Sequence, residues 1–218
     1  MWDRLRNLAK AAGIAIMLAA PALAAAEPAR IVAFGDSLTS GYGLPPDDGF
    51  AAQLQRWLAD HGTEAEVQNA GVSGDTTAGG LARIDWTLSA PADAMIVTLG
   101  GNDLLRGLPP EEARANLDAI LARIADKGLP VLLVPMLAPG NYGPDYKASF
   151  DAIYADLAAD HGAILADPFL APILALPDRQ QALADYIQPD GLHPTAKGVA
   201  LVVEALGPKV LELLRRTE

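Results

Sequence analysis

The sequence predicts an α/β protein, a three-layer α/β/α sandwich in which helices cover both faces of a central parallel sheet. Short β-branched runs alternate along the chain with longer helical patterns, and strands that alternate with helices form parallel sheets. The apolar runs at residues 95–97 and 131–134 lack the period-two alternation of a half-exposed strand. Such runs are expected where helices cover a sheet on both sides.

The expected elements follow one another from residue 30 onward. Arg30–Phe34 is a β-branched run that ends at Gly35, and a helical pattern extends from Phe50 to His61. The remaining expected strands and helices are Glu66–Gln68 with Leu81–Leu88, Ala94–Leu99 with Glu111–Lys127, Val131–Val134 with Phe150–His161, and a last helix Val199–Arg215. We expect a sheet of about five strands, a common size. The loops at the carboxyl ends of these strands are where a ligand site is expected.

The first 26 residues are typical of a secretory signal peptide. Positive residues precede an apolar run at 11–20, and small residues follow up to Ala26. A membrane anchor is the alternative, but a span takes about 20 apolar residues and this run is shorter and meets Pro21. We therefore expect cleavage after Ala24 or Ala26, no stable anchor after cleavage, and a periplasmic or secreted protein.

Residues 27–218 are expected to form one domain. The chain has 218 residues, 51% of them hydrophobic, which suits a single domain with a sizeable core. Its formal net charge is −11, and loss of Asp3, Arg4, Arg6 and Lys10 with the signal peptide makes it −13. So acidic a surface disfavours nucleic acids as partners. Because the chain has no cysteine, covalent catalysis would have to use an oxygen or nitrogen nucleophile.

Two of the three histidines have a structural interpretation. His61 and His161 each stand in an Asp-His-Gly context at the end of an expected helix, where a histidine interacts favourably with the helix dipole. His193 remains, in the turn-rich segment Asp190–Pro194 before the last helix. An aspartate beside a histidine fixes its tautomer for use as a base. A capping aspartate with a solvated histidine is an equally good interpretation of this pair alone.

Ser37 is the candidate nucleophile for that pair. It follows the first strand directly, and Gly35 permits a sharp turn there. Taken alone, Ser37 could simply cap a following helix, a role that serines after strands often have. Its surroundings do not match the Gly-x-Ser-x-Gly turn of α/β-hydrolases, because Thr39 stands at the second glycine position.

Two further glycine-rich loops offer hydrogen-bond donors for an oxyanion. The segments at residues 71–75 and 100–103 each follow an expected strand. The N–H groups of Ser37 and Gly74 and the side-chain amide of Asn102 would form an oxyanion hole. The alternative is that both loops are ordinary turns.

Taken together, these blocks resemble the GDSL, or SGNH, hydrolases. Gly-Asp-Ser-Leu at 35–38, Gly-Gly-Asn-Asp at 100–103 and Asp-Gly-Leu-His-Pro at 190–194 occur in family order. The blocks are most similar to the bacterial thioesterase I, lysophospholipase L1 and arylesterase group. The resemblance implies a flavodoxin-like fold, Ser37, Asp190 and His193 as triad, Ser37, Gly74 and Asn102 as oxyanion hole, and no metal or cofactor.

An apolar groove is expected to receive the acyl chain of a small-molecule ester or thioester. Six residues in or near the loops of the expected active edge are candidates to line it: Leu104, Leu105, Leu108, Leu137, Tyr142 and Ile187. Ordinary core packing is the alternative for each. By the resemblance, residues 104–109 would form a mobile flap beside the groove.

The function expected is that of a serine esterase acting on carboxylic esters, with thioesters and lysophospholipids as further substrates. A carbohydrate acetylesterase would use the same triad with a smaller, more polar pocket. A non-catalytic periplasmic binding domain is a second alternative. A metal-dependent phosphoesterase is a third, disfavoured because such sites gather several histidine and aspartate ligands and only three histidines are present.

Overall fold

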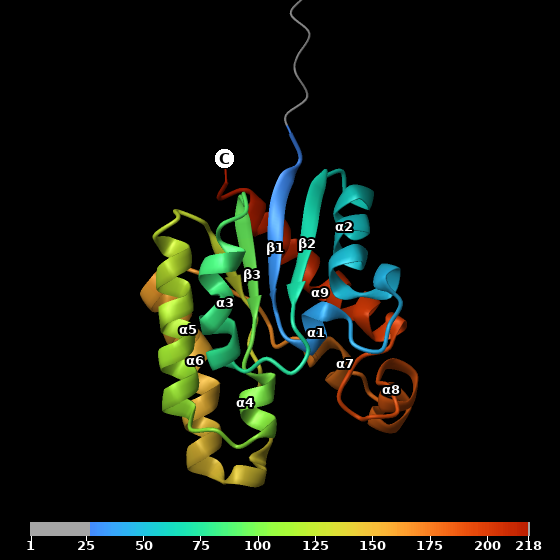
Figure 1. Ribbon diagram of the computed structural model, residues 1–218. Coiled ribbons are helices and arrows are strands. Elements are labelled where there is room, and N and C mark those ends of the chain that lie inside the picture. The colour runs from blue at the N-terminus through green and yellow to red at the C-terminus, as the bar shows by residue number, and fades with distance from the viewer. Residues whose placement is uncertain (1–26, 218) are drawn as a thin grey trace, which may run out of the picture.

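The computed structural model describes residues 27–217 (Figure 1). The expected signal peptide, residues 1–26, lies outside the described residues. Within residues 27–217, none of the helices has the length and apolar character needed to cross a membrane.

A five-stranded parallel sheet forms the centre, with strand order β2-β1-β3-β4-β5. The strands are β1 (Ala29–Gly35), β2 (Ala65–Gly71), β3 (Ala94–Thr98), β4 (Val131–Leu133) and β5 (Ile164–Leu165). Gly35 pairs with both Gly71 and Thr98, so the three neighbouring strands end at one level. The chain passes from β1 to β2 on one side and then crosses back to β3 on the other side of β1. The strand order therefore reverses at β1, and in such sheets ligands bind at the carboxyl end of the strands at this reversal point.

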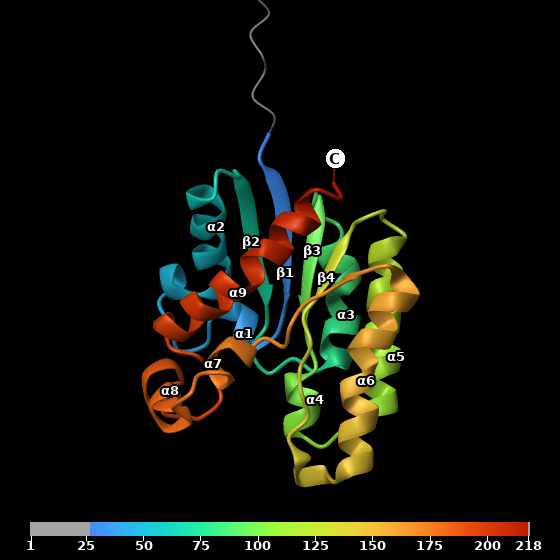
Figure 2. The same ribbon diagram turned by 180° about the vertical axis from the view of Figure 1, so that it is seen from behind.

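Helices cover both faces of the sheet. On one face lie α2 (Phe50–Asp60) and α9 (Ala196–Leu214), which pack against each other. On the other lie α3 (Thr77–Thr87) and α5 (Pro110–Ala125), with α6 (Pro144–His161) alongside α5. Figure 2 shows α9 crossing in front of the strands, whereas in Figure 1 α3 is in front. The predicted three-layer sandwich is therefore confirmed.

Short helices gather where the strand arrows point, at the lower end of Figure 1. They are α1 (Ser37–Ser40), α4 (Gly101–Leu105), α7 (Ala171–Leu174) and α8 (Arg179–Tyr186), accompanied by 3₁₀ turns at Pro46–Asp48 and Gly140–Tyr142. The sequence periodicity did not predict them, because segments of one or two turns carry too few residues for a period to emerge.

The helix bounds differ from expectation mainly at amino termini. Helix α3 begins at Thr77 rather than Leu81, because the Thr76 side chain accepts the N–H of Gly79 at 3.3 Å and caps it. Helix α6 begins at Pro144, six residues before Phe150, with proline at its first position, where its missing N–H costs nothing. Strand β5 was not located because it has only two residues.

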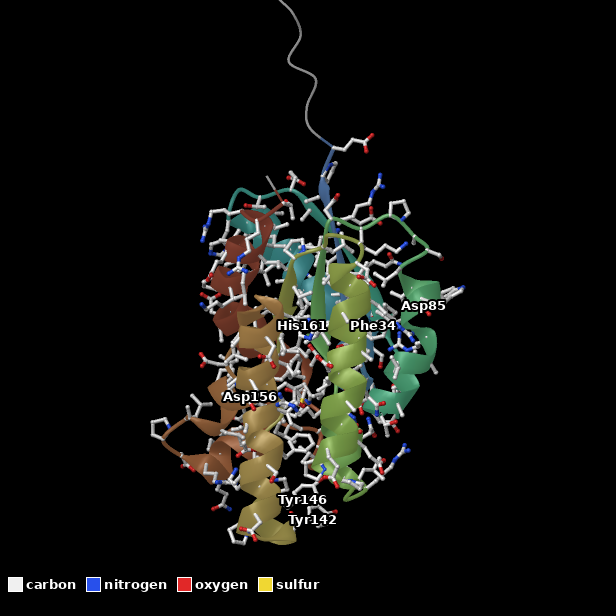
Figure 3. The ribbon with its side chains drawn as sticks, turned by 90° about the vertical axis from the view of Figure 1, so that its left-hand side faces the viewer. Phe34, Asp85, Tyr142, Tyr146, Asp156 and His161 are labelled. Carbon is white, nitrogen blue, oxygen red and sulfur yellow. The ribbon has the colours of Figure 1, made fainter. Side chains whose placement is uncertain are left out.

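The two histidines interpreted as structural lie at helix ends. The His161 ring nitrogen Nε2 is 2.6 Å from the Asp118 carboxylate and joins α6 to α5, between which Figure 3 shows it. The His61 ring stacks on Trp57 at 3.7 Å, and its Nδ1 lies 2.7 Å from the Trp57 carbonyl. Each ring, at the carboxyl end of its helix, thus has a hydrogen-bonding partner.

Candidate active site

Ser37 is the first residue of α1, and Asp36 alone separates it from the end of β1, an inner strand of the sheet. Asp36 caps this helix by accepting the N–H of Leu38 at 3.0 Å. The turn requires glycine at position 35, because a β-carbon there would collide with the Thr39 side chain and lie 2.6 Å from the Thr98 carbonyl. Strand, glycine and cap together place the Ser37 hydroxyl at the carboxyl edge of the sheet.

A hydrogen-bonded chain joins Ser37 to the segment before α9. Ser37 Oγ lies 2.8 Å from His193 Nε2, and His193 Nδ1 lies 2.6 Å from Asp190 Oδ2. The other carboxylate oxygen, Oδ1, accepts the N–H groups of Leu192 at 2.9 Å and His193 at 3.1 Å. The Leu192 N–H and the His193 side chain stabilise the charged carboxylate and lower the pKa of Asp190 from 3.8 to about 2. The carboxylate is therefore ionised at neutral pH and holds a proton on Nδ1, leaving Nε2 free to accept one from the serine.

Asn102 faces the same place from helix α4. Its Nδ2 donates to the Asp75 carbonyl at 2.9 Å and lies 3.4 Å from Asp36 Oδ2. Helix α4 is anchored by the next residue, the buried Asp103, which accepts the Thr77 N–H at 2.8 Å and the Thr77 hydroxyl at 2.6 Å. Asn102 is thus held between the loop after β2 and the residue before Ser37.

Gly74 lies one residue from Asp75, whose carbonyl receives the Asn102 amide. Its φ of +87° is a conformation that favours glycine. Its carbonyl accepts the Arg106 guanidinium at 2.8 Å. Among residues 27–217, no acceptor receives the N–H of Ser37 or of Gly74. Gly74 does not line the pocket described next, whereas Ser37 and Asn102 do.

A pocket of about 290 Å³ opens beside Ser37 and His193. Four of the six expected groove residues line it: Leu104, Leu105, Leu137 and Tyr142. Besides Ser37, Asn102 and His193, the rest of the wall is mostly apolar or small and has two polar members, Asp36 and Asn141. Its apolar or small members are Leu38, Gly101, Met136, Pro139, Leu170 and Leu192. Figure 3 shows Tyr142 beside Tyr146 near the lower end of α6, and their ring centroids are 5.0 Å apart. An apolar pocket beside a hydroxyl and an imidazole suits an acyl chain.

The other two expected groove residues do not line this pocket. Ile187 is buried, with 7% of its surface exposed, and pairs through its backbone with Pro194. Leu108 turns its carbonyl to the Tyr146 hydroxyl at 2.8 Å. Substrate contact therefore remains a prediction for both residues, and the pocket wall gives it no support.

The segment expected to be a flap is partly helical. Leu104 and Leu105 end helix α4, and the N–H groups of Gly107 and Leu108 continue the turn by donating to the carbonyls of Leu104 and Asp103, at 3.1 and 3.0 Å. The Tyr142 ring packs over Gly107, where a β-carbon would lie 2.9 Å from a ring carbon. Hydrogen bonds within the turn and an aromatic ring above it thus hold this side of the pocket.

Comparison with known proteins identifies the chain's relatives. Residues 33–201 match the model of the GDSL-like lipase/acylhydrolase family. The chain belongs to that family. An arylesterase of Vibrio mimicus is 33% identical over 85% of this chain and 90% of its own length. Esterase TesA of Pseudomonas aeruginosa is 43% identical over 53% of this chain, and the matched segment spans 58% of that protein.

Solved structures agree with this assignment. AlinE4, an SGNH-hydrolase family esterase, is 45% identical, with a TM-score of 0.70 over 88% of this chain and 99% of its own. A structure of TesA is 34% identical, with a TM-score of 0.75 over 84% of this chain and 99% of its own. The GDSL-like family membership therefore rests on sequence and fold together.

Within this GDSL-like chain, Asp36 is a buried carboxylate next to the proposed nucleophile. Only 1% of its surface is exposed, and burial raises its pKa from 3.8 to about 6, against the lowering effect of the Leu38 N–H. A charge on Asp36 and a positive charge on His193 stabilise each other. Asp36 stands in the family's Gly-Asp-Ser-Leu block, but the sequence pattern alone did not indicate a role for it.

Arg83 is a second residue that sequence reasoning missed. From α3 its guanidinium donates to Asp75 Oδ2 at 2.6 Å, to the Ala70 carbonyl at 2.9 Å and to the Gly35 carbonyl at 2.8 Å. It also lies 4.1 Å above the Phe34 ring. One side chain therefore joins the ends of β1 and β2 to the loop that holds Asn102. Nothing in the local sequence around Arg83, which lies within an expected helix, indicated that its side chain would make these contacts.

No group of three or more histidine, aspartate or glutamate side chains within residues 27–217 is placed to hold a metal ion.

Proposed function

We propose that this chain is a serine esterase in which Ser37 is the nucleophile, His193 the general base and Asp190 the residue that orients the histidine. The observation that carries the proposal is the unbroken chain of contacts from Ser37 Oγ through His193 to Asp190, at 2.8 and 2.6 Å, at the edge of an apolar pocket. Nucleophile, base and orienting group within hydrogen-bond reach are the signature of covalent acyl transfer. The relatives named esterase and arylesterase support the same chemistry.

The reaction begins when Ser37 Oγ attacks the carbonyl carbon of the ester and its proton passes to His193 Nε2. The negative charge that develops on the substrate oxygen is stabilised by the N–H groups of Ser37 and Gly74 and by the Asn102 amide. Collapse of this intermediate breaks the ester bond, and His193 gives its proton to the leaving alkoxide. The acyl group remains on Ser37.

Water completes the cycle by the same route. His193 removes a proton from a water molecule, whose oxygen attacks the acyl-serine carbonyl carbon. As the bond from this carbon to Ser37 Oγ breaks, His193 returns the proton to Oγ, and the carboxylic acid leaves. Asp190 stays ionised throughout and stabilises the imidazolium in both halves.

The apolar pocket favours substrates with a hydrocarbon acyl chain over acetylated carbohydrates. Its wall presents leucine, methionine and tyrosine side chains, and the one amide-bearing wall residue besides Asn102 is Asn141. A thioester or lysophospholipid presents the same acyl carbonyl, and a relative in Escherichia coli is named thioesterase 1/protease 1/lysophospholipase L1. We therefore propose aryl and alkyl esters as substrates, with thioesters and lysophospholipids as further substrates.

We also propose that the protein acts after export, periplasmic or secreted, as a single domain of residues 27–218. The support lies in the sequence of residues 1–26, with its positive start, apolar run and small residues before Ala26. Amino-terminal sequencing of the protein recovered from the periplasm or the medium tests this. A mature terminus at residue 25 or 27 is expected, and a retained Met1 would contradict it.

Hydrolysis of p-nitrophenyl esters from acetyl to palmitoyl tests the proposed function. Wild type and Ser37→Ala are compared in excess chelator, with Ser89→Ala as matched control because Ser89 is an exposed serine beyond α3. Loss of the nucleophile should lower kcat by about 10⁶-fold, and the control should match wild type. Equal activity of wild type and Ser37→Ala would reject the mechanism. A preference for acetyl esters alone would favour the acetylesterase alternative.

A further inference from the structure

Ser37 and His193 are 156 positions apart in the chain, yet their side chains must meet at hydrogen-bond distance. Each stands on its own segment: Ser37 on the short helix α1, and His193 on the loop between α8 and α9. The direct contact between the two side chains is the one that catalysis must break and remake. Other contacts must therefore fix the position of α1 relative to the loop that carries His193.

The side chain of Gln188 makes such a contact. Its Nε2 donates to two carbonyl oxygens, that of Tyr42 at 2.9 Å and that of Pro194 at 2.8 Å. Both hydrogens of one amide are thus used, one on each segment. The Gln188 N–H donates in addition to the His193 carbonyl at 2.7 Å, which closes the loop that carries the histidine.

Tyr42 continues this connection to the nucleophile. The N–H groups of Tyr42 and Gly41 donate to the Ser37 carbonyl at 3.1 and 3.2 Å. A path of hydrogen bonds thus runs from the Ser37 backbone through Tyr42 and Gln188 to the His193 backbone. The Tyr42 ring also packs on the His193 ring, with centroids 4.7 Å apart and planes at 38°.

Gly43 is shaped to admit the Gln188 amide. It has a φ of +75°, and a β-carbon there would overlap the Gln188 Oε1 atom. Any larger residue would therefore push the amide away from the Tyr42 carbonyl. The glycine after Tyr42 has the space and the backbone conformation that this contact needs.

We propose that Gln188 and Tyr42 are positioning residues that set the distance between Ser37 and His193, an inference that rests on the proposed function. Gln188 ties the two segments through its amide, and the Tyr42 ring limits the tilt of the imidazole. Neither residue lines the pocket beside Ser37. Their loss should lower kcat and leave KM nearly unchanged, because the substrate contacts stay in place.

Variants of Gln188 should still fold, because a second side chain, that of Gln53, also binds the start of α9. Gln53 Nε2 donates to the Ala196 carbonyl at 3.0 Å and to the Asp48 carbonyl at 2.7 Å. Loss of the Gln188 amide therefore releases the histidine loop locally and leaves α9 in place on α2.

Gln188→Glu is the sharpest variant, since it keeps the shape and replaces both donor hydrogens with a carboxylate oxygen that repels the two carbonyls. We expect kcat to fall by between about 10- and 100-fold, the usual cost of displacing reacting groups by around 1 Å. A protonated glutamate regains one donor, so the deficit relative to wild type should shrink at acid pH. Gln188→Ala should show the same loss without that recovery. Gln180→Glu, on the exposed face of the adjacent α8, is the matched control for charge.

Two further variants separate the two parts of the proposal. Gly43→Ala should reproduce the kcat loss of Gln188→Ala. Tyr42→Phe keeps the ring and should retain more of the wild-type kcat than Tyr42→Ala.

Two outcomes would overturn the proposal. One is a wild-type kcat and pH profile in both Gln188 variants. The other is a pH-independent loss of kcat that a reduced folded fraction, measured by circular dichroism, explains. If Ser37→Ala remains as active as wild type, the proposed function fails instead, so the two failures are distinguishable.

Discussion

Arg83 donates to the carboxylate of Asp75 at 2.6 Å, and this short ion pair is largely shielded from solvent, with 20% and 17% of the two side chains exposed. The Asp75 carbonyl in turn accepts the Asn102 amide at 2.9 Å. A residue in the middle of helix α3 therefore holds the loop on which an oxyanion-hole donor depends.

Arg83→Met should lower kcat by between about 10- and 100-fold, because the loop after β2 loses its anchor and Asn102 loses its fixed acceptor. Arg83→Lys should recover little of the lost kcat. A lysine ammonium lacks the planar set of donors with which the guanidinium reaches one carboxylate and two carbonyls. Arg114→Met, which removes an exposed pair with Asp156, is the matched control. Steady-state kinetics and thermal unfolding measured together check this. A lower Tm with unchanged kcat would show that Arg83 serves only the fold.

Asn102→Ala should lower kcat by about 10²–10³-fold, the usual effect of removing one oxyanion donor. The variant should remain folded, because Asp103 still anchors α4 to Thr77 through bonds of 2.8 and 2.6 Å. The measurement is kcat for one p-nitrophenyl ester, with circular dichroism to confirm the fold. A loss smaller than about 10-fold would remove Asn102 from the oxyanion hole.

Asp36 should make the folded state less stable as pH rises from about 4 to about 6. Its folded pKa of about 6 exceeds the reference value of 3.8, so in this window the folded state binds the proton that the unfolded state has lost. The stability lost by pH 7 is on the order of 3 kcal/mol, as the difference between a pKa of 3.8 and one of about 6 implies. Asp36→Asn should abolish this part of the pH dependence while its side-chain oxygen still caps Leu38.

Urea unfolding at pH 4, 5, 6 and 7 measures the Asp36 effect. Asp178→Asn is the control, since Asp178 is an exposed aspartate that also caps a helix, at Gln181 N. The difference in unfolding free energy between wild type and Asp36→Asn should change across the window and be constant above it. A difference that is independent of pH would contradict the raised pKa.

Tyr154→Phe should destabilise the fold by about 1–3 kcal/mol, because a buried carbonyl loses its donor. The Tyr154 hydroxyl donates to the Leu99 carbonyl at 2.9 Å, and the side chain is 1% exposed. Burial raises the pKa of this hydroxyl well above its usual range, so it stays a donor up to high pH. Denaturant unfolding checks the value, with the partly exposed Tyr186→Phe as control. A change below about 0.5 kcal/mol would show that the carbonyl finds another partner.

The layers of the fold and the central residues of the site could be predicted because the signals are local. Residues 95–97 and 131–133 lie in buried strands, as the unbroken apolar pattern of these segments indicated. Asp190 and His193 stand three residues apart on one turn, so their contact needs only a local backbone shape. Ser37 follows a strand directly, and parallel strands bring their carboxyl ends to one edge.

The sequence by itself therefore determined the alternation of strands and helices, the edge of the sheet at which the site residues lie, and the residue types available there. Only the tertiary structure decided which side chains meet across the loops. Arg83 and Gln188 make contacts with the loops of the site, and Met136 lines the pocket, whereas Leu108 and Ile187 are not among the pocket-lining residues. Periodicity and turn chemistry are properties of a few neighbouring residues, but a pocket wall depends on how segments more than a hundred residues apart pack against one another.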